Sequence, residues 1–97
     1  MEPLSPAELS GFLSRHPRWA LEGGMLCCTF EAQTFLAAVR FVDEVARLVD
    51  AADHHPDIDV RWRRVTLRFV THDAGNRVTA LDARLAAECE LLFDAAV

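Results

Sequence analysis

The 97-residue sequence contains no lysine, and its ten basic residues are arginines scattered along the chain. Acidic residues number 15, which gives a formal net charge of -5 at pH 7. A surface that binds nucleic acid usually carries a basic patch, and this sequence offers no cluster of arginines for one. The sequence also lacks an apolar run of membrane-spanning length. We therefore expect no nucleic-acid partner and no membrane partner.

Cysteine is scarce as well, with only Cys27, Cys28 and Cys89. An odd number with two adjacent members does not suit a disulfide framework, and the Cys and His spacings match no common metal site. We expect buried thiols and no bound metal. Residues 1–10 lack the basic start and the apolar stretch of a signal peptide, so the expected location is the cytoplasm.

The composition is that of a globular protein, because 52% of the residues are apolar and 26% are charged. No linker, repeat or low-complexity tract interrupts the chain, so residues 1–97 are expected to form a single domain. A domain of this size can bury only part of its apolar surface. Association with further copies of the chain would therefore add stability, and we expect a homo-oligomer.

Local signals in the first third of the chain predict a helix and a β-hairpin. Ser5-Pro6-Ala7-Glu8 combines a cap, a first-turn proline and an acid three residues on, which predicts a helix start. His16-Pro17 ends this helix. Gly23-Gly24 predicts a two-residue turn between strands at 18–22 and 25–32.

Two more helices and two more strands are predicted in the rest of the chain. Thr34 caps a helix whose predicted apolar stripe is Phe35, Val39, Val42, Ala46 and Val49. The stripe is widened by Leu36, Phe41, Val45 and Leu48. Residues 58–62 and 65–70 alternate between apolar and polar, which predicts two strands, and Thr79-Ala80-Leu81-Asp82 starts the last helix. The order α-β-β-α-β-β-α predicts an α+β fold: a four-stranded antiparallel sheet with three helices packed on one face.

Three of the four histidines lie at the boundaries of predicted elements, His54 and His55 after a helix and His72 after a strand. Imidazole has an unperturbed pKa of about 6.5, so converging histidines can divide the roles of acid and base near neutral pH. Pro56 restricts His55 to extended geometry. From the residues alone, two other interpretations stay open: solvated loop histidines, or a pH-responsive or metal-sensing site, although adjacent histidines chelate a metal poorly.

A longer pattern contains these histidines. In chain order, it comprises Asp50, His54-His55-Pro56, Trp62, Thr71-His72 and Asp82. This order and these gaps resemble the signature of the pterin-4a-carbinolamine dehydratases. The likeness covers nearly the whole chain, from Trp19 to Ala86, and a five-part pattern is far more specific than a short motif.

The resemblance implies that the protein dehydrates a 4a-hydroxytetrahydropterin to the quinonoid dihydropterin, in the recycling of a tetrahydrobiopterin-type cofactor, without a cofactor of its own. His54, His55 and His72 would be the catalytic residues. Substrate contacts would come from Asp50, Asp53, Thr71, Asp73 and Trp19, although a strand-borne tryptophan is more often a core residue. The implied assembly is a homodimer or homotetramer. The alternative is a non-catalytic dimerisation cofactor or assembly chaperone of the same fold.

The sequence departs from the family pattern in three places. Gly75-Asn76-Arg77-Val78-Thr79 stands where the family usually has a Gly-Gly-Leu-Ser/Thr turn, Asp50 stands where glutamate is common, and Leu81 stands where some members have arginine. These departures affect a loop and two outlying positions, and they leave the set of histidines intact.

Overall fold

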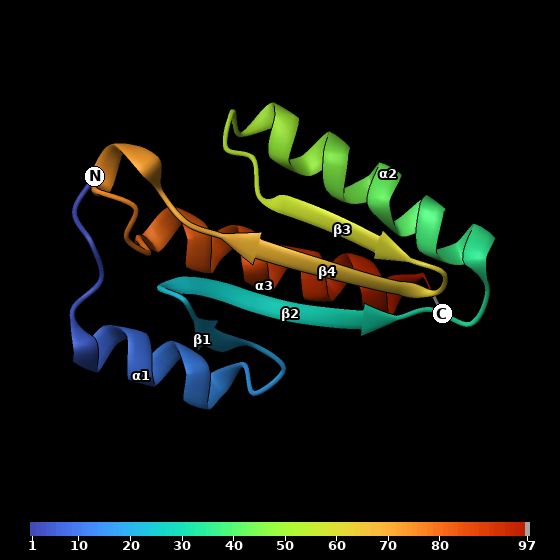
Figure 1. Ribbon diagram of the computed structural model, residues 1–97. Coiled ribbons are helices and arrows are strands. Elements are labelled where there is room, and N and C mark those ends of the chain that lie inside the picture. Colours follow the sequence, from blue (N-terminus) through green and yellow to red (C-terminus); the bar gives the residue numbers. More distant parts are fainter. Residues whose placement is uncertain (97) are drawn as a thin grey trace.

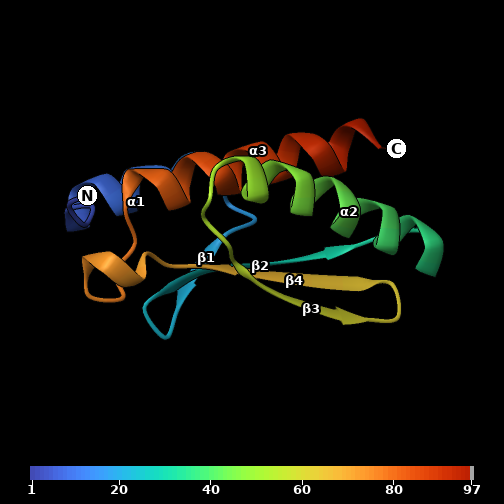
Figure 2. The same ribbon diagram turned by 90° about the horizontal axis from the view of Figure 1, so that it is seen from above.

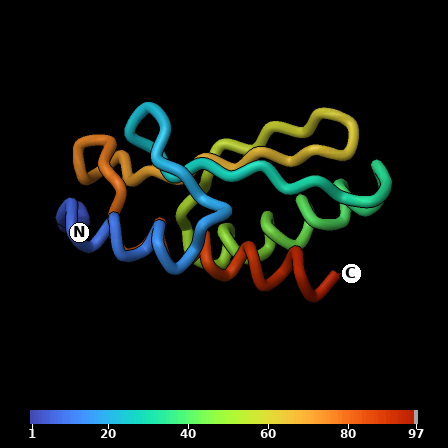
Figure 3. Tube along the Cα trace, turned by 90° about the horizontal axis from the view of Figure 1, so that it is seen from below, coloured from blue at the N-terminus to red at the C-terminus, as the bar shows by residue number. Residues whose placement is uncertain are grey.

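The computed structural model describes residues 1–96 and has two layers, with three helices covering one face of a four-stranded antiparallel sheet (Figures 1 and 2). The view from the opposite side shows the same arrangement (Figure 3). In chain order the elements are α1 (Pro6–Arg15), β1 (Ala20–Glu22), β2 (Met25–Glu31), α2 (Phe35–Ala51), β3 (Asp57–Arg61), β4 (Arg64–Phe69), the 3-10 helix η1 (His72–Ala74) and α3 (Ala80–Ala95). The predicted fold class and element order are confirmed.

The strands lie in the order β1-β2-β4-β3, so β2 and β4 form the centre and β1 and β3 form the edges. Gly23 and Gly24 both have positive φ angles, 58° and 80°, as the predicted hairpin turn between β1 and β2 requires. The centre of the sheet is the buried part. Val65, Leu67 and Phe69 of β4 are fully buried beneath the helices, whereas Ile58 and Val60 of the edge strand β3 are exposed.

The predicted helix starts are also present. Ser5 Oγ accepts the backbone N–H of Glu8, and the Glu8 carboxylate accepts the backbone N–H of Ser5, which completes a capping box at α1. Thr34 Oγ1 accepts the N–H of Ala37 at the start of α2. These caps depend only on residues within one turn, so the sequence carries the whole signal.

The predicted apolar stripe of α2 was partly right. Phe35 and Val39 are exposed, and the face that packs on the sheet carries Ala38, Phe41, Val45 and Val49. Phe41, Val45 and Val49 were predicted to be on the apolar face, whereas Ala38 was not. Because α2 also has apolar residues on its outer side, the helical period alone fits more than one face.

Trp62 was expected to continue β3, but it lies in the turn between β3 and β4. Its φ angle is 53°, and its side chain is 68% exposed. The ring packs against the guanidinium of Arg63 at 4.3 Å from the ring centroid. Trp62 therefore belongs to the surface and not to the sheet.

The segment after α1 is held against α3 by charged groups. His16 Nδ1 lies 3.1 Å from Glu90 Oε1, and Arg18 donates to Asp94 Oδ1 at 2.8 Å. The hydrogen bond to Asp94 raises the pKa of Arg18 above its ordinary value.

Among residues 1–96, no helix is both long enough and apolar enough to cross a membrane.

Candidate active site

The antiparallel pairing of β3 and β4 explains how distant histidines come together. Asp57 at the start of β3 pairs with Arg68 near the end of β4. The segment that precedes β3 and the segment that follows β4 therefore lie at the same end of the sheet. His54 and His55 lie in the first of these segments and His72 in the second.

A pocket of about 310 Å³ opens at this end of the sheet. Its lining is drawn from both segments and consists of Asp53, His54, His55, Val70, Thr71, His72 and Asp73. All three predicted catalytic residues and three of the five predicted substrate contacts are thus brought to one cavity. Its volume lies within the range of about 300–1,000 Å³ that is usual for small-molecule sites.

The C-terminus of α2 fixes the position of His54. Asp53 has a left-handed backbone with a φ angle of 50°, which Asp tolerates better than most residues. Its N–H donates to the carbonyl of Asp50 at 3.1 Å, and the N–H of His54 donates to the carbonyl of Val49 at 3.1 Å. This pair of bonds is a Schellman motif, so His54 leaves the helix in a defined direction.

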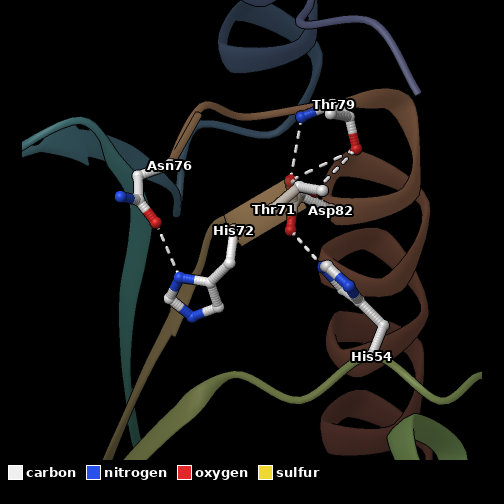
Figure 4. A network of polar contacts seen from close by, with 6 residues as sticks. All are labelled: His54, Thr71, His72, Asn76, Thr79 and Asp82. Atoms are coloured by element: carbon white, nitrogen blue, oxygen red, sulfur yellow. Dashed lines mark hydrogen bonds and ion pairs between the residues drawn. The ribbon is translucent and has the colours of Figure 1, made fainter. Parts of the chain in front are cut away.

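The His54 ring is only 12% exposed and is bound to a buried carboxylate (Figure 4). Its Nε2 lies 2.5 Å from Oδ1 of Asp82, in the first turn of α3. The other oxygen of Asp82 accepts Thr71 Oγ1 at 2.7 Å and the backbone N–H of Thr79 at 2.8 Å. Because this carboxylate accepts on both oxygens, Nε2 of His54 carries the proton, and Nδ1 is the nitrogen left to a ligand.

The hydroxyl groups of Thr71 and Thr79 complete this network. Their Oγ1 atoms lie 2.8 Å apart, and both residues are buried. Thr71 lines the pocket as predicted, but its hydroxyl is occupied by Asp82. We refer to His54, Thr71, Thr79 and Asp82 as the buried wall of the pocket.

Aromatic packing supports the buried wall from behind. The ring of Phe69 lies nearly parallel to that of His54, with an interplanar angle of 12° and a centroid distance of 6.5 Å. Trp19 in turn packs on Phe69 with a centroid distance of 5.9 Å. Trp19 is 3% exposed and does not line the pocket, which corrects its predicted place among the ligand contacts. Its indole packs on Phe30 and Phe69 in the core, and Phe69 also contacts the ring of His54.

His55 and Asp50 lie on the solvent side. His55 Nε2 is 3.2 Å from Asp50 Oδ1, with side-chain exposures of 56% and 84%. His55 also lines an adjoining cleft of about 620 Å³ between α2 and β3, where Asp50 lies. Asp50 is thus placed beside the histidine pocket and not within it.

The His72 side chain is exposed and is bound by one partner. β4 ends at Phe69, and His72 is the first residue of η1. The side chain of His72 lines the pocket. Its Nδ1 lies 2.6 Å from Oδ1 of Asn76 (Figure 4). We refer to His55 and His72, together with their partners Asp50 and Asn76 outside the pocket lining, as the exposed wall. In residues 1–96, no cluster of three or more His, Cys, Asp or Glu side chains is placed to hold a metal ion.

A model of the family described as pterin 4 alpha carbinolamine dehydratase matches residues 2–92. This chain belongs to the pterin-4-alpha-carbinolamine dehydratase family. A family relative from Chloroflexus aurantiacus is 48% identical over 87 residues, covering 90% of this chain and 92% of the relative. One from Acidobacterium capsulatum is 44% identical over 93 residues, covering 96% and 100%.

A solved structure of the same fold is the transcriptional coactivator/pterin dehydratase from Brucella melitensis. It superposes with a TM-score of 0.88 at 25% identity, covering 94% of this chain and 98% of that chain. This member of the pterin-4-alpha-carbinolamine dehydratase family therefore shares its fold with a protein that is named both as a transcriptional coactivator and as a pterin dehydratase.

Two functional candidates of this family member escaped sequence reasoning as site residues. Asp82 was recognised as part of the signature and as a helix-cap residue, but its bond to His54 spans 28 residues and has no local signal. Asn76 was noted only as a departure from the usual loop. Its backbone is left-handed, with a φ angle of 58°, a conformation that asparagine tolerates better than most residues.

The buried thiols lie apart from the pocket lining. Burial raises the pKa of Cys28 and of Cys89 to about 12. Both side chains pack in the core, and Cys27 is also buried and unpaired among the described residues. The prediction of buried thiols is confirmed, and the high pKa makes them poor nucleophiles at neutral pH.

Proposed function

We propose that this protein catalyses the dehydration of a 4a-hydroxytetrahydropterin to the quinonoid dihydropterin by histidine acid/base catalysis, as part of the recycling of a tetrahydrobiopterin-type cofactor. The observation that carries the proposal is the single pocket lined by His54, His55 and His72, in a chain of the dehydratase family. Asp53 and Asp73 on its rim offer acceptors for the N–H groups of a pterin.

The chemistry requires two proton movements. The C4a–O bond breaks as a proton is delivered to the departing hydroxyl group, so that water leaves. The N5–H bond then gives up its proton, and its electron pair forms the new N5=C4a double bond. One acid and one base close to the ring suffice, and positioned side chains of this kind typically contribute about 10²–10⁴-fold in rate.

The buried wall suits His54 for one of these steps. Asp82 holds the ring through Nε2–H, which leaves Nδ1 as the atom that exchanges a proton with the ligand. Holding the ring in one orientation lowers the entropic cost of reaching the transition state.

The test is the rate of dehydration of chemically generated 4a-hydroxytetrahydropterin. We expect His54→Ala and His72→Ala each to lower kcat/KM by about 10²-fold or more, and His16→Ala to retain the wild-type rate, because His16 lies at the end of α1 and contacts Glu90. Circular dichroism establishes that each variant is folded. Wild-type rates in both His54→Ala and His72→Ala would refute the proposal.

The second candidate is a non-catalytic dimerisation cofactor or assembly chaperone. It is favoured by one observation, the exposed apolar side chains of Phe35, Leu36 and Val39 on α2. The solved relative from Brucella melitensis also carries the name of a transcriptional coactivator. A binding role of this kind should survive His72→Ala and be lost in Leu36→Asp. The dehydratase role predicts instead that kcat/KM falls by about 10²-fold or more in His72→Ala.

We also propose that the protein works in the cytoplasm as a homodimer or homotetramer. The exposed backbone edge of β3 and the apolar side chains on α2 offer surfaces for association between copies. Light scattering after size exclusion measures the mass directly, and a mass of 10.8 kDa, that of one chain, would exclude this assembly.

A further inference from the structure

Asn76 lies in a short loop whose backbone is closed on itself. The N–H of Thr71 donates to the carbonyl of Arg77 at 3.0 Å, and the N–H of Arg77 donates back to the carbonyl of Thr71 at 3.3 Å. Within the loop, the N–H groups of Gly75 and Asn76 donate to the carbonyl of His72 at 3.1 and 3.4 Å. The backbones of His72 and Asn76 are therefore held in a fixed relation.

The conformation at position 76 restricts which residues fit. Its φ angle of 58° is in the left-handed region, where glycine is free and asparagine is among the few tolerated side chains. A glycine would satisfy the backbone equally well. What asparagine adds is a side-chain oxygen 2.6 Å from His72 Nδ1 (Figure 4).

We propose that Asn76 is a positioning residue that holds neutral His72 in the tautomer with its proton on Nδ1 and its lone pair on Nε2. An amide oxygen can only accept, so the ring nitrogen that faces it must donate. No residue in the described part of the chain makes a hydrogen bond to Nε2 of His72. Nε2 is then the atom that accepts a proton.

This assignment deepens the proposed dehydratase function and rests on it for its catalytic meaning. With its lone pair on Nε2, His72 is the base that takes the N5 proton. His54, whose Nε2–H is bound to Asp82, serves the departing hydroxyl as the acid in the form that also carries a proton on Nδ1. The two histidines carry opposite tautomers, since Asp82 fixes the proton of His54 on Nε2 and Asn76 fixes that of His72 on Nδ1. The partner of each histidine thus fixes which ring nitrogen is left to the ligand, Nδ1 in His54 and Nε2 in His72.

The direct test is the tautomer of His72, measured on the full-length protein by two-bond proton–nitrogen correlation spectra above the pH at which the ring is protonated. We expect the Nδ1–H pattern in the wild type. A neutral imidazole side chain in water favours the Nε2–H tautomer, so Asn76→Gly, which suits the left-handed backbone, should shift His72 toward Nε2–H. Asn76→Asp retains the acceptor and should retain the Nδ1–H pattern.

The kinetic consequence is measured on the same variants. We expect Asn76→Gly to lower kcat/KM about three- to tenfold, the effect typical of one hydrogen bond. Asn76→Asp should restore most of the rate and move the acid limb of the pH–rate profile to higher pH, because the added carboxylate favours protonated His72. A purely structural role for Asn76 would change neither the tautomer nor this limb.

The outcomes are separable from those of the proposed function. An Nε2–H tautomer in the wild type would overturn the inference whatever the activity, and so would a tautomer change in Asn76→Gly with an unchanged rate. The Nδ1–H tautomer in a protein without dehydratase activity would support the contact made by Asn76 and refute the reaction.

Discussion

The buried wall and the exposed wall of the pocket use the same side chain in opposite surroundings. His54 is enclosed, lies over Phe69 and is held by a carboxylate that makes three further contacts with Thr71 and Thr79. His72 is exposed and held by a single amide oxygen. The comparison shows that one pocket can combine two kinds of histidine. His54 is held by residues of the core, whereas His72 is accessible and is held only by a residue of its own loop.

The two walls should therefore contribute very differently to folding. A buried polar network costs stability when one member is removed, because its partners are left unsatisfied. Exposed pairs contribute little, because water replaces either partner. The predictions below compare the two walls, from the largest expected effect to the smallest.

Removal of the aromatic support behind His54 should have the largest effect. Trp19→Ala should lower the free energy of unfolding by about 3–5 kcal/mol, because the buried indole packs on Phe69 and leaves a cavity. Trp62→Ala, at the exposed turn, should change it by less than about 0.5 kcal/mol. Urea denaturation measures both. Equal effects would contradict the placement of Trp19 in the core.

Neutralising Asp82 should weaken the buried wall directly. Asp82→Asn preserves size but turns one accepting oxygen into a donor, which then faces either His54 Nε2–H or Thr71 and Thr79. We expect a loss of about 2–4 kcal/mol in the free energy of unfolding. A change below about 0.5 kcal/mol would show that the carboxylate is not satisfied in the way described.

The core behind the walls should make the protein sensitive to alkaline pH. Burial raises the pKa of Cys28 and of Cys89 to about 12, whereas unfolded thiols have a pKa near 9. Above pH 9 the unfolded chain loses these protons and the folded chain keeps them, so stability falls as pH rises. Each thiol should account for about 1.4 kcal/mol at pH 10 relative to pH 7.

The control for the alkaline effect is the double variant Cys28→Ala with Cys89→Ala. Its free energy of unfolding should be lower at pH 7 but should change less between pH 8 and pH 10. The same pH dependence in the double variant would assign the effect to other groups.

The exposed wall should give the smallest effect. Asp50→Asn removes the carboxylate that lies beside His55, and we expect a change within about 0.5 kcal/mol. It is the matched control for Asp82→Asn, because the substitution is the same and the wall is different. A loss as large as that of Asp82→Asn would remove the distinction between the walls.

Sequence reasoning succeeded where the signals are local. The caps at Ser5 and Thr34 and the Gly23-Gly24 turn involve residues within four positions, and the structure confirms them. It was only partly right for the buried face of α2, because exposed Phe35 and Val39 are as apolar as the residues that pack on the sheet. Periodicity indicates that a helix has apolar positions, but it does not show which of its faces packs on the sheet.

For the site, the family resemblance supplied more than the residue pattern did. The gathering of His54, His55 and His72 at one pocket depends on the register of β3 with β4, which periodicity does not give. The partners of the histidines were not predicted, because Asp82 and Asn76 act through contacts that appear only when the chain is folded. Trp19 was predicted to contact the ligand, but it lies in the core. A flat aromatic ring can pack in a core as well as against a planar ligand, so the residue type does not distinguish the two places.

The central claim is that both walls face one pterin, and the four histidines allow it to be tested in one spectrum. In a ring proton–nitrogen spectrum titrated with 7,8-dihydropterin, a non-reacting analogue, we expect the signals of His54, His55 and His72 to shift with a common dissociation constant. His16, which is bound to Glu90 at the far end of α1, should stay unchanged. Shifts at His54 without His72, or equal shifts at His16, would contradict a ligand held between the two walls.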